Sequence, residues 1–544
     1  MFEIFILSFL ATFFYTPYGY FFQKGNGISS LSLQLVFGLI ILSFFSLITN
    51  FFAPLSKFIN TFFLILGFII IWKYKEVYLR KKYFIFCFLS SIILFLLLTK
   101  SNVYRPDAGL YHLPYISILN NEKIIIGLSN LHFRFGHISI IQYNSAIFNN
   151  LLFGDRGLNL AIGIIVSTII LNYLSNFNYR LKKKQFDFYF FLIFSLLIFI
   201  FYKVNRFSEY GNDAPAHLLM FLLVSEIIKN SKEMNNSKFS NYILISVYIF
   251  MNKIILLLCF LFPLTLVLKK KFKLKFFTKK NIFIFIFISL WTIKNIFVSG
   301  CILYPIKSTC LESLSWTNVE KARQVSIENE AWAKGWPDLN KDKSKLSIQN
   351  YSKKFNWIKT WGKNHFIKIL KIMIPYIIVL LIIILFIRSE KKTFRIDKLF
   401  KYIIFINIIG IAMWFLKVPV FRYGYSYLIL FTSLIFATFG NSFHLKERSK
   451  FLFKSSIILL LIIFVSKNLN RILYYNYDYF DYPWPKIYSM DDNNVLEKPN
   501  SKLINGKKFY HTNTSYCMYG NSPCGITVDG LKHKKVLNYS LIYK

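Results

Sequence analysis

Residues 371–388 read Lys-Ile-Met-Ile-Pro-Tyr-Ile-Ile-Val-Leu-Leu-Ile-Ile-Ile-Leu-Phe-Ile-Arg, an apolar run with a cation at each end. As a helix this run covers about 27 Å, close to the roughly 30 Å hydrocarbon core of a bilayer. Similar runs recur along the 544 residues, of which 55% are hydrophobic and 19% aromatic, with a mean hydropathy of +0.45. Open strands are not tolerated in lipid, so the sequence predicts an all-α polytopic membrane helical bundle.

Positive charge gathers in short clusters between the apolar runs. The chain has 66 Lys and Arg against 25 Asp and Glu, a formal charge of +41. In a soluble chain this excess suggests nucleic acid, but Lys and Arg in short loops mark the cytoplasmic side of a membrane protein. The clusters assigned to the cytoplasm are residues 73–82, 180–184, 229–238, 269–280, 388–401 and 446–454.

Placing these clusters on one side fixes the alternation of the spans. The expected spans lie near residues 2–22, 31–52, 58–72, 83–99, 158–177, 186–202, 213–229, 281–298, 371–388, 401–416, 423–440 and 455–468. Residues 242–268 lie between two cytoplasmic clusters and must cross twice or turn back within the membrane. The sequence thus predicts about 13–14 crossings, with the amino terminus outside and the first span retained rather than cleaved as a signal.

This map divides the chain into a transmembrane bundle over residues 1–468 and a small mixed C-terminal domain over 469–544, with outside loops at 100–157 and 299–370. Two cysteine pairs fall in outside segments, Cys301 with Cys310 and Cys517 with Cys524. An oxidising compartment allows both pairs to form local disulfides. We expect this most strongly of Cys517 and Cys524, because the residues between them favour a turn.

Two polar clusters lie in the first outside loop. Asp107, Tyr111 and His112 follow Pro106, which suits the first position of a short helix, so Asp107 and Tyr111 share one face. This carboxylate is either a helix-stabilising charge or part of a functional site. In the second cluster, His132, Arg134 and His137, the spacing matches no firm metal motif, and an anion-holding role for Arg134 is favoured.

Three further positions on the same side carry charge. Asp213 and His217 share a helix face at a membrane boundary, either as a capping pair or as groups facing a cavity. Lys253 lies at the tip of the 242–268 hairpin, where it either extends to the interface or holds an anion. Arg422 shares a tight turn with Lys417, and both could be harmless interfacial cations, but arginine suits phosphate.

Four stretches carry a family resemblance. They are residues 107–114 with 127–136, residues 294–305, residues 414–424 and residues 517–524. Over about residues 100–535 the chain resembles a bacterial polytopic membrane family without an assigned biochemical role. More broadly, a first outside loop carrying an Asp, a multi-span bundle and a terminal periplasmic domain are similar to the GT-C class of integral membrane glycosyltransferases. Here Asp107 lacks the acidic neighbour that many of those enzymes have.

The resemblance implies an enzyme of the bacterial inner membrane with a periplasmic active face. It would transfer a sugar, with inversion, from a polyprenyl-phosphate donor to a glycan, lipid or protein acceptor of the envelope. Asp107 would be the general base, assisted by His112 or Asp213, while Arg134, Lys253 and Arg422 would hold the donor phosphate. The further substrate contacts expected are Tyr111, His132, His137 and His217.

Partners and cofactors follow from the same resemblance. No nucleotide loop is needed and none is found, no nucleic acid is expected, and a divalent cation is left open. Two other functions compete with the glycosyltransferase. One is an O-antigen-type polymerase or ligase, which also combines many spans with outside Arg and His. The other is a transporter or flippase of lipid-linked glycans, which would need charged groups nearer mid-membrane.

Overall fold

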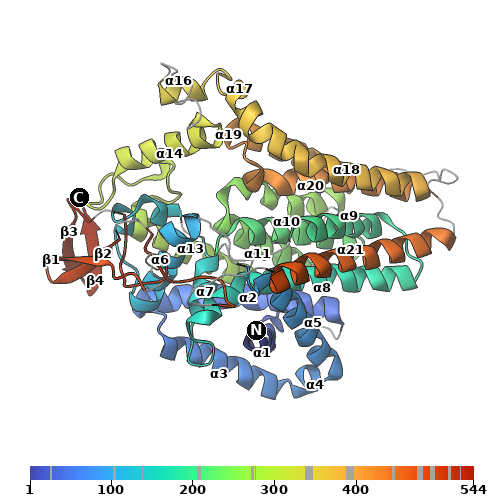
Figure 1. Ribbon diagram of the computed structural model, residues 1–544, viewed down its shortest axis with the longest axis horizontal. Coiled ribbons are helices and arrows are strands. Elements are labelled where there is room, and N and C mark those ends of the chain that lie inside the picture. The colour runs from blue at the N-terminus through green and yellow to red at the C-terminus, as the bar shows by residue number, and fades with distance from the viewer. Residues whose placement is uncertain are drawn as a thin grey trace.

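The protein is a bundle of long helices with short strands at one end (Figure 1). The computed structural model describes residues 1–24, 27–101, 106–137, 139–204, 210–270, 275, 277–336, 347–387, 397–443, 447–474, 482–489, 496–512, 516–526 and 528–544. The predicted basic clusters at 269–280, 388–401 and 446–454 lie partly outside these residues. The predicted class, a helical multi-pass membrane protein, is confirmed.

Nine helical segments of the described chain are long and apolar enough to span a membrane. They are Phe2–Gly19 (α1 with η1), Ile28–Phe52 (α2), Lys81–Leu98 (α5), Gly154–Lys182 (η5 with α8), Lys279–Ser299 (α13), Ile358–Ile387 (α17, η9 and α18), Lys398–Lys417 (α19), Phe421–Asn441 (α20) and Ser449–Tyr474 within α21 (Glu447–Tyr474). Each coincides with one of the expected spans. Serine, asparagine and aspartate side chains cap several helices of the bundle; Asp187, for example, accepts from the Phe190 N–H at the start of α9.

The predicted 13–14 crossings include helices shorter than these nine. The remaining expected spans are helices, but each has 17 or fewer residues in its apolar part: Lys57–Lys73 (α3), Phe188–Lys203 (α9), Asp213–Lys229 (α10), Asn236–Asn252 (α11) and Ile254–Phe260 with Leu261–Lys270 (η6 with α12). A stretch of 17 residues covers about 25 Å, somewhat less than the usual hydrocarbon thickness. Several of these short helices, notably α9 and α10, are almost wholly covered by neighbouring helices.

The predicted turn within residues 242–268 is present, and Lys253 lies at its tip. Helix α11 ends at Asn252, Lys253 has an extended backbone, and η6 begins at Ile254. The Ser246 hydroxyl donates to the Cys259 carbonyl oxygen at 3.2 Å. Because these two residues are nearly equidistant from Lys253, α11 and η6 run antiparallel, as a hairpin requires.

Shorter elements connect the spans. Helices between α3 and α9 are Lys75–Tyr78 (α4), Ala108–His112 (η2), Leu113–Asn121 (α6), Leu128–Asn130 (η3), Phe133–His137 (η4) and Ile141–Ile147 (α7). Those between α13 and α18 are Lys307–Thr309 (η7), Val319–Ala333 (α14), Ile348–Ser352 (α16), Ile358–Trp361 (α17) and Gly362–Phe366 (η9). Of these elements, α6 and α14 lie toward the strands, whereas α4 lies away from them (Figure 1).

The named strands of the described residues all lie in the C-terminal region, for which the sequence predicts a small mixed domain. In its described part, two antiparallel hairpins form, β1 (Asn500–Ile504) with β2 (Lys507–His511) and β3 (Lys532–Val536) with β4 (Tyr539–Tyr543). Strand β4 is tied to the first outside loop, since the Ile542 N–H donates to the Ile126 carbonyl oxygen at 2.8 Å. We call the end of the bundle that carries these strands the strand end.

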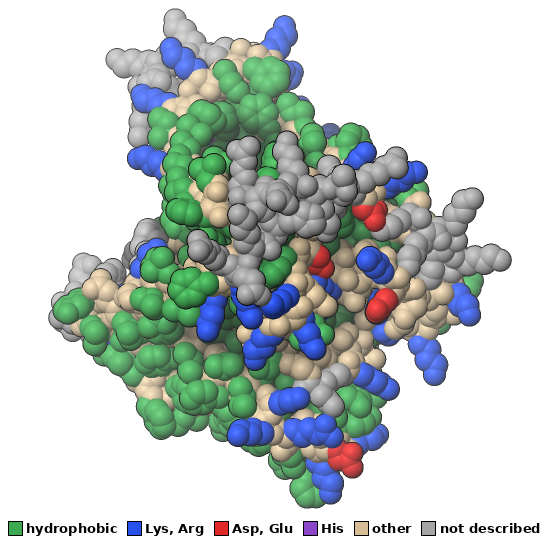
Figure 2. All heavy atoms as spheres, turned by 90° about the vertical axis from the view of Figure 1, so that its right-hand side faces the viewer, with side chains coloured by type: hydrophobic (Ala, Val, Ile, Leu, Met, Phe, Trp, Pro, Cys, Tyr) green, Lys and Arg blue, Asp and Glu red, His purple; other side chains and the backbone are tan. Residues whose placement is uncertain are grey.

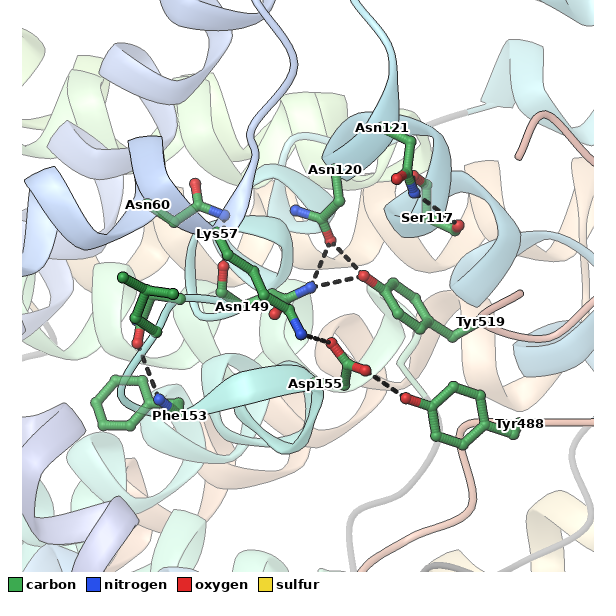
Figure 3. A network of polar contacts seen from close by, with 12 residues as sticks. Lys57, Asn60, Ser117, Asn120, Asn121, Asn149, Phe153, Asp155, Tyr488 and Tyr519 are labelled. Atoms are coloured by element: carbon green, nitrogen blue, oxygen red, sulfur yellow. Dashed lines mark hydrogen bonds and ion pairs between the residues drawn. The ribbon is translucent and has the colours of Figure 1, made fainter. Parts of the chain in front are cut away.

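Two tyrosines fasten the C-terminal region to the bundle (Figure 3). The Tyr519 hydroxyl donates to the Asn120 Oδ1 at 3.1 Å and accepts from the Asn149 amide at 2.6 Å, and the Tyr488 hydroxyl donates to Asp155. Asp155 also forms an ion pair with Lys57 of α3 at 3.0 Å. The region after α21 is therefore packed on the bundle and does not stand apart from it.

The opposite end of the bundle, which we call the basic end, carries clustered cations (Figure 2). Lys and Arg side chains gather there, and few acidic side chains accompany them. The turns between α10 and α11 and before α13 meet at this end, because Lys280 donates to the Ser237 hydroxyl at 2.8 Å and to Asn241 at 2.7 Å. This grouping is the one that the loop charges predicted.

Candidate functional site

Four charged side chains from distant parts of the sequence meet at the strand end. Arg422 Nη1 lies 2.9 Å from Asp107 Oδ2, and Lys253 forms an ion pair with Asp213. Arg422 Nε lies 3.9 Å from the other oxygen of Asp213, which joins the two pairs. We call Asp107, Asp213, Lys253 and Arg422 the ion-pair cluster. The sequence indicated each of these residues separately, and the structure brings all four together.

Helix ends position three members of the cluster. Asp213 is the first residue of α10, Lys253 follows the last residue of α11, and Arg422 is the second residue of α20. The Asn212 side chain donates to the Asn252 carbonyl, so the start of α10 and the end of α11 are joined directly. An Asp at a helix start also lies favourably in the field of the helix dipole.

His217 lies behind the cluster rather than in it. Its Nε2 lies 2.9 Å from the carbonyl oxygen of Arg422 and its Nδ1 lies 2.7 Å from the Ser426 hydroxyl. The ring is wholly buried, and both nitrogens already have protein partners. The expectation that His217 contacts substrate is therefore revised: its geometry is that of a positioning residue that holds the first turn of α20 and with it Arg422.

Asp107 reaches the cluster from a helix that contains a π turn. Pro106 and Asp107 are helical, residues 108–112 are wound more widely, and the Leu113 N–H donates to the Ala108 carbonyl oxygen five residues earlier. Wide turns of this kind recur at functional sites. Both Tyr111 and His112, which lie in this turn, are close enough to Asp107 for its charge to raise their pKa values.

His112 is a buried, neutral group beside the cluster. Its Nδ1 lies 2.9 Å from the Gln142 amide nitrogen, which fixes the ring. Burial lowers the pKa of His112 to about 4, although Asp107 and Asp213 act in the opposite direction. An imidazole with this pKa is uncharged at pH 7 and weakly basic, so it suits hydrogen bonding better than proton abstraction.

Arg134 gives the site an excess of positive charge. Its guanidinium lies 5.7 Å from the centre of the Tyr111 ring and 5.2 Å from that of Phe133. Among the residues that the structure describes, no carboxylate is paired with it. Burial, together with Asp107, raises the pKa of Tyr111, whereas Arg134 and Arg422 lower it. With two carboxylates against Lys253, Arg422 and Arg134, the site has one uncompensated positive charge.

Aromatic rings surround the cations, and of these rings the sequence indicates only Tyr111 as a site residue. The Tyr423 hydroxyl accepts from Arg422 Nη2 at 3.0 Å, and Lys253 Nζ lies 4.5 Å from the centre of its ring. Trp332 of α14 lies 5.3 Å from the Arg422 guanidinium and remains 44% exposed. Tyr423 could have been suspected from its place beside Arg422, but a lone Trp in a polar loop gives no such signal.

His132 and His137 lie outside the ion-pair cluster. His132 Nδ1 accepts from the Arg134 N–H at 3.0 Å, and His137 Nε2 lies 3.3 Å from the Asn329 amide of α14. Burial lowers the pKa of both rings to about 3, and neighbouring Arg134 contributes. These contacts place η4 against α14 and orient Arg134, so the two histidines support the site rather than form its surface.

Both predicted disulfides are present, Cys301–Cys310 and Cys517–Cys524. The second lies against the π turn: the Met518 N–H donates to the Gly109 carbonyl oxygen at 3.0 Å. A Cβ atom on Gly109 would lie 2.4 Å from Met518 Sδ, so any larger residue would require the Met518 side chain to move. The segment 517–524 thus covers the helix that carries Asp107, Tyr111 and His112.

For a divalent cation, no group of three or more His, Cys, Asp or Glu is assembled within the described ranges. The two carboxylates of the cluster face Arg422 and Lys253 instead. Lys417, which shares the turn with Arg422, is 65% exposed in its side chain and pairs with Glu330 of α14 at 3.5 Å. It therefore holds α14 over the cluster without entering it.

Fold and site together define a multi-pass helical membrane protein with an ion-paired, aromatic-rimmed site at one end of its bundle. The chain belongs to the family described as "Domain of unknown function (DUF8201)", whose model matches residues 1–429. The matched stretch contains the whole ion-pair cluster and Trp332 but not the C-terminal strands. No curated protein and no solved structure matches the chain.

Proposed function

We propose that this protein is a GT-C-type integral membrane glycosyltransferase of a bacterial envelope pathway. It moves a sugar from a polyprenyl-phosphate donor to an acceptor in the periplasm, so the strand end faces outward and the basic end faces the cytoplasm. The observation that carries the proposal is the ion-pair cluster with Arg134 beside it, which combines carboxylates, surplus positive charge and exposed aromatic surface at the ends of membrane helices.

Arg422 suits the donor phosphate. Its guanidinium has five N–H donors, of which one contacts Asp107 and another contacts Tyr423. The remaining donors, with Arg134 close by, can bind two phosphate oxygens in the bidentate way that arginine favours. The side chain is 39% exposed, so a lipid-linked phosphate entering between helices can reach it.

The transfer step follows from these placements. The acceptor hydroxyl oxygen attacks the anomeric carbon, the bond from that carbon to the phosphate oxygen breaks, and the polyprenyl phosphate leaves with the bonding electrons. The acceptor proton passes to the Asp107 carboxylate, which becomes a stronger acceptor as Arg422 turns its donors to the phosphate. Asp213 remains paired with Lys253 and holds both cations in position.

The location of the charges also bears on the rival functions. The cluster lies at the first residues of α10 and α20 and just after the last residue of α11, not halfway along these helices. A carrier that alternates access around a central site needs polar groups near the bilayer midplane. This position supports chemistry at a membrane face over a transporter or flippase, and it leaves a polymerase or ligase to be separated by experiment.

The test uses the purified full-length protein in liposomes with a polyprenyl-phosphate-linked sugar and an extract of envelope acceptors. Asp107→Asn and Arg422→Ala should each lower the transfer rate about a hundredfold or more, as expected for loss of a catalytic base or of charge stabilisation. Arg156→Ala is the matched control, because Arg156 forms an ion pair with Glu3 outside the site and both side chains are about half exposed.

Transfer at the wild-type rate by Asp107→Asn would reject the assignment of the base. Mass spectrometry of lipid-linked intermediates in cells separates the polymerase: a strain with Arg422→Ala should lack a sugar, whereas accumulation of complete single repeat units would mean that the protein joins units instead.

A further inference from the structure

A polar pocket lies at the strand end, apart from the ion-pair cluster. It has a volume of about 390 Å³ and is formed by three distant segments: Asn130 of η3, Glu312 with residues 315–320 before and within the first turn of α14, and Lys544. We call it the Trp316 pocket. None of its lining residues belongs to the ion-pair cluster, and the proposed transfer step makes no use of it.

The walls of this pocket are fixed by the fold. The Trp316 indole N–H donates to the Ile296 carbonyl oxygen at 2.9 Å, which holds the ring against the end of α13. The Asn130 amide donates to the Trp316 carbonyl oxygen at 2.9 Å and to the Ile542 carbonyl oxygen at 3.2 Å. The loop that leads to Trp316 is closed by the Cys301–Cys310 disulfide. The pocket therefore needs little rearrangement to accept a ligand.

The lining chemistry matches the hydroxyl groups and apolar ring faces of a sugar. Trp316 offers a flat apolar surface, while the Glu312 and Glu320 carboxylates and the hydroxyl of Ser315 accept hydrogen bonds. Glu320 is paired with Lys307 at 3.5 Å, whereas Glu312 has no ion-pair partner within the described part of the chain. The only aliphatic side chain of the lining is Val319, too little for the apolar side-chain pockets that peptide recognition uses.

Helix α14 links the pocket to the ion-pair cluster. Its first residue, Val319, lines the Trp316 pocket, and Trp332 near its end lies against Arg422. These residues are 13 apart, which corresponds to about 20 Å along the helix. A chain of several linked sugars can therefore occupy the pocket with one end while the other end reaches the cluster.

We propose that the Trp316 pocket is a binding subsite for an oligosaccharide acceptor, which extends along α14 to the ion-pair cluster. This inference rests on the proposed glycosyltransferase function and narrows its acceptor from a glycan, lipid or protein to a glycan chain. Trp332 then supports the acceptor end that receives the sugar, and Trp316 supports the far end.

The experiment separates binding from transfer. Fluorescently labelled full-length protein in detergent micelles is applied to an array of hexose and N-acetylhexosamine oligosaccharides together with unglycosylated peptides. The wild type and Asp107→Asn should bind the same oligosaccharides, Trp316→Ala should weaken that binding about tenfold, and Trp316→Phe should largely retain it, because stacking needs only an aromatic face. Trp72→Ala is the matched control, since Trp72 is 69% exposed on α3 and lies in neither site.

Glu312→Gln tests the subsite with a variant that should keep the wild-type fold, because Glu312 is an exposed side chain without an ion-pair partner in the described residues. It should weaken oligosaccharide binding several-fold, at about the cost of one charge-assisted hydrogen bond. Absence of oligosaccharide binding by the wild type, equal binding by Trp316→Ala and Glu312→Gln, or a preference for peptides would each overturn the subsite. Full transfer by Asp107→Asn would instead overturn the proposed function and leave the binding result standing.

Discussion

Helix α11 has a lysine–carboxylate pair near each end, and the two pairs differ in how far their side chains are exposed to solvent. At the basic end Lys238 lies 3.6 Å from Glu233, with side chains 32% and 84% exposed. At the strand end Lys253 pairs with Asp213, with side chains 7% and 25% exposed. The first pair is solvated and dispensable, whereas the second is enclosed by α10, α20 and η2. One helix therefore carries the same kind of ion pair twice. At the basic end the lysine belongs to a cluster of solvated cations, whereas at the strand end it belongs to the candidate site.

The strongest test of this contrast is to leave Lys253 without its partner. Asp213→Ala should lower the free energy of unfolding by about 3 kcal/mol, because an uncompensated buried charge is costly. Thermal unfolding in detergent measures this loss. The double variant Asp213→Ala with Lys253→Met should recover part of it, since no unpaired charge then remains. Equal stability of the single variant and the wild type would contradict the assignment of a buried pair.

A second difference between the ends is covalent, since both disulfides lie at the strand end. Replacing Cys517 and Cys524 by serine opens a short loop and should cost about 2 kcal/mol by the chain-entropy estimate. Because residue 518 is hydrogen-bonded to Gly109, hydrogen exchange should rise in residues 106–112 as well as in 517–524. If exchange rises only within 517–524, that segment does not support the π turn.

The strand end should also respond to acid. His112, His132 and His137 have pKa values of about 4, 3 and 3, against an ordinary 6.5 when unfolded. Between these pH values the unfolded chain binds more protons than the folded protein. The three neutral rings therefore make their full contribution to the free energy of unfolding above about pH 6.5, and this contribution falls as the pH is lowered toward 4. Each ring contributes up to about 1.4 kcal/mol per pH unit. Melting temperatures from pH 8 to 4.5 measure the slope, and His137→Gln should make it shallower.

The close contact between the π turn and the C-terminal segment gives a smaller effect. Gly109→Ala places a Cβ against the flexible end of Met518, so we expect a loss of about 1 kcal/mol from local overpacking. Met518→Ala in the same chain should restore most of the lost stability and of the transfer activity. Additive losses in the double variant would show that the two residues do not compete for the same space.

The sequence predicts the spans and the cysteine pairs well because each depends on local information. Apolar length defines a helix such as α18, and loop charge places its ends. The ion-pair cluster has no such local signature: Asp107 and Arg422 are 315 positions apart, and only packing of α10, α11 and α20 makes them partners. The sequence does not indicate the positioning role of His217 or the place of Trp332 beside Arg422, for the same reason. Both follow from contacts between helices rather than from the spacing of residues along one helix.

The smallest expected effect is at the basic end. Lys238→Gln removes one cation of a basic cluster from which the sequence predicts a cytoplasmic location for this end. The ion pair of Lys238 with Glu233 is largely solvated. The change in the free energy of unfolding should stay within about 0.5 kcal/mol, as for other exposed pairs. Lys253→Gln, measured beside it by thermal unfolding, should lose several times more, because it leaves Asp213 facing only Arg422 across 3.9 Å. Equal losses for the two glutamine variants would mean that the Lys253 pair is as solvated as the Lys238 pair, and the contrast between the two ends of α11 would then not be one of burial.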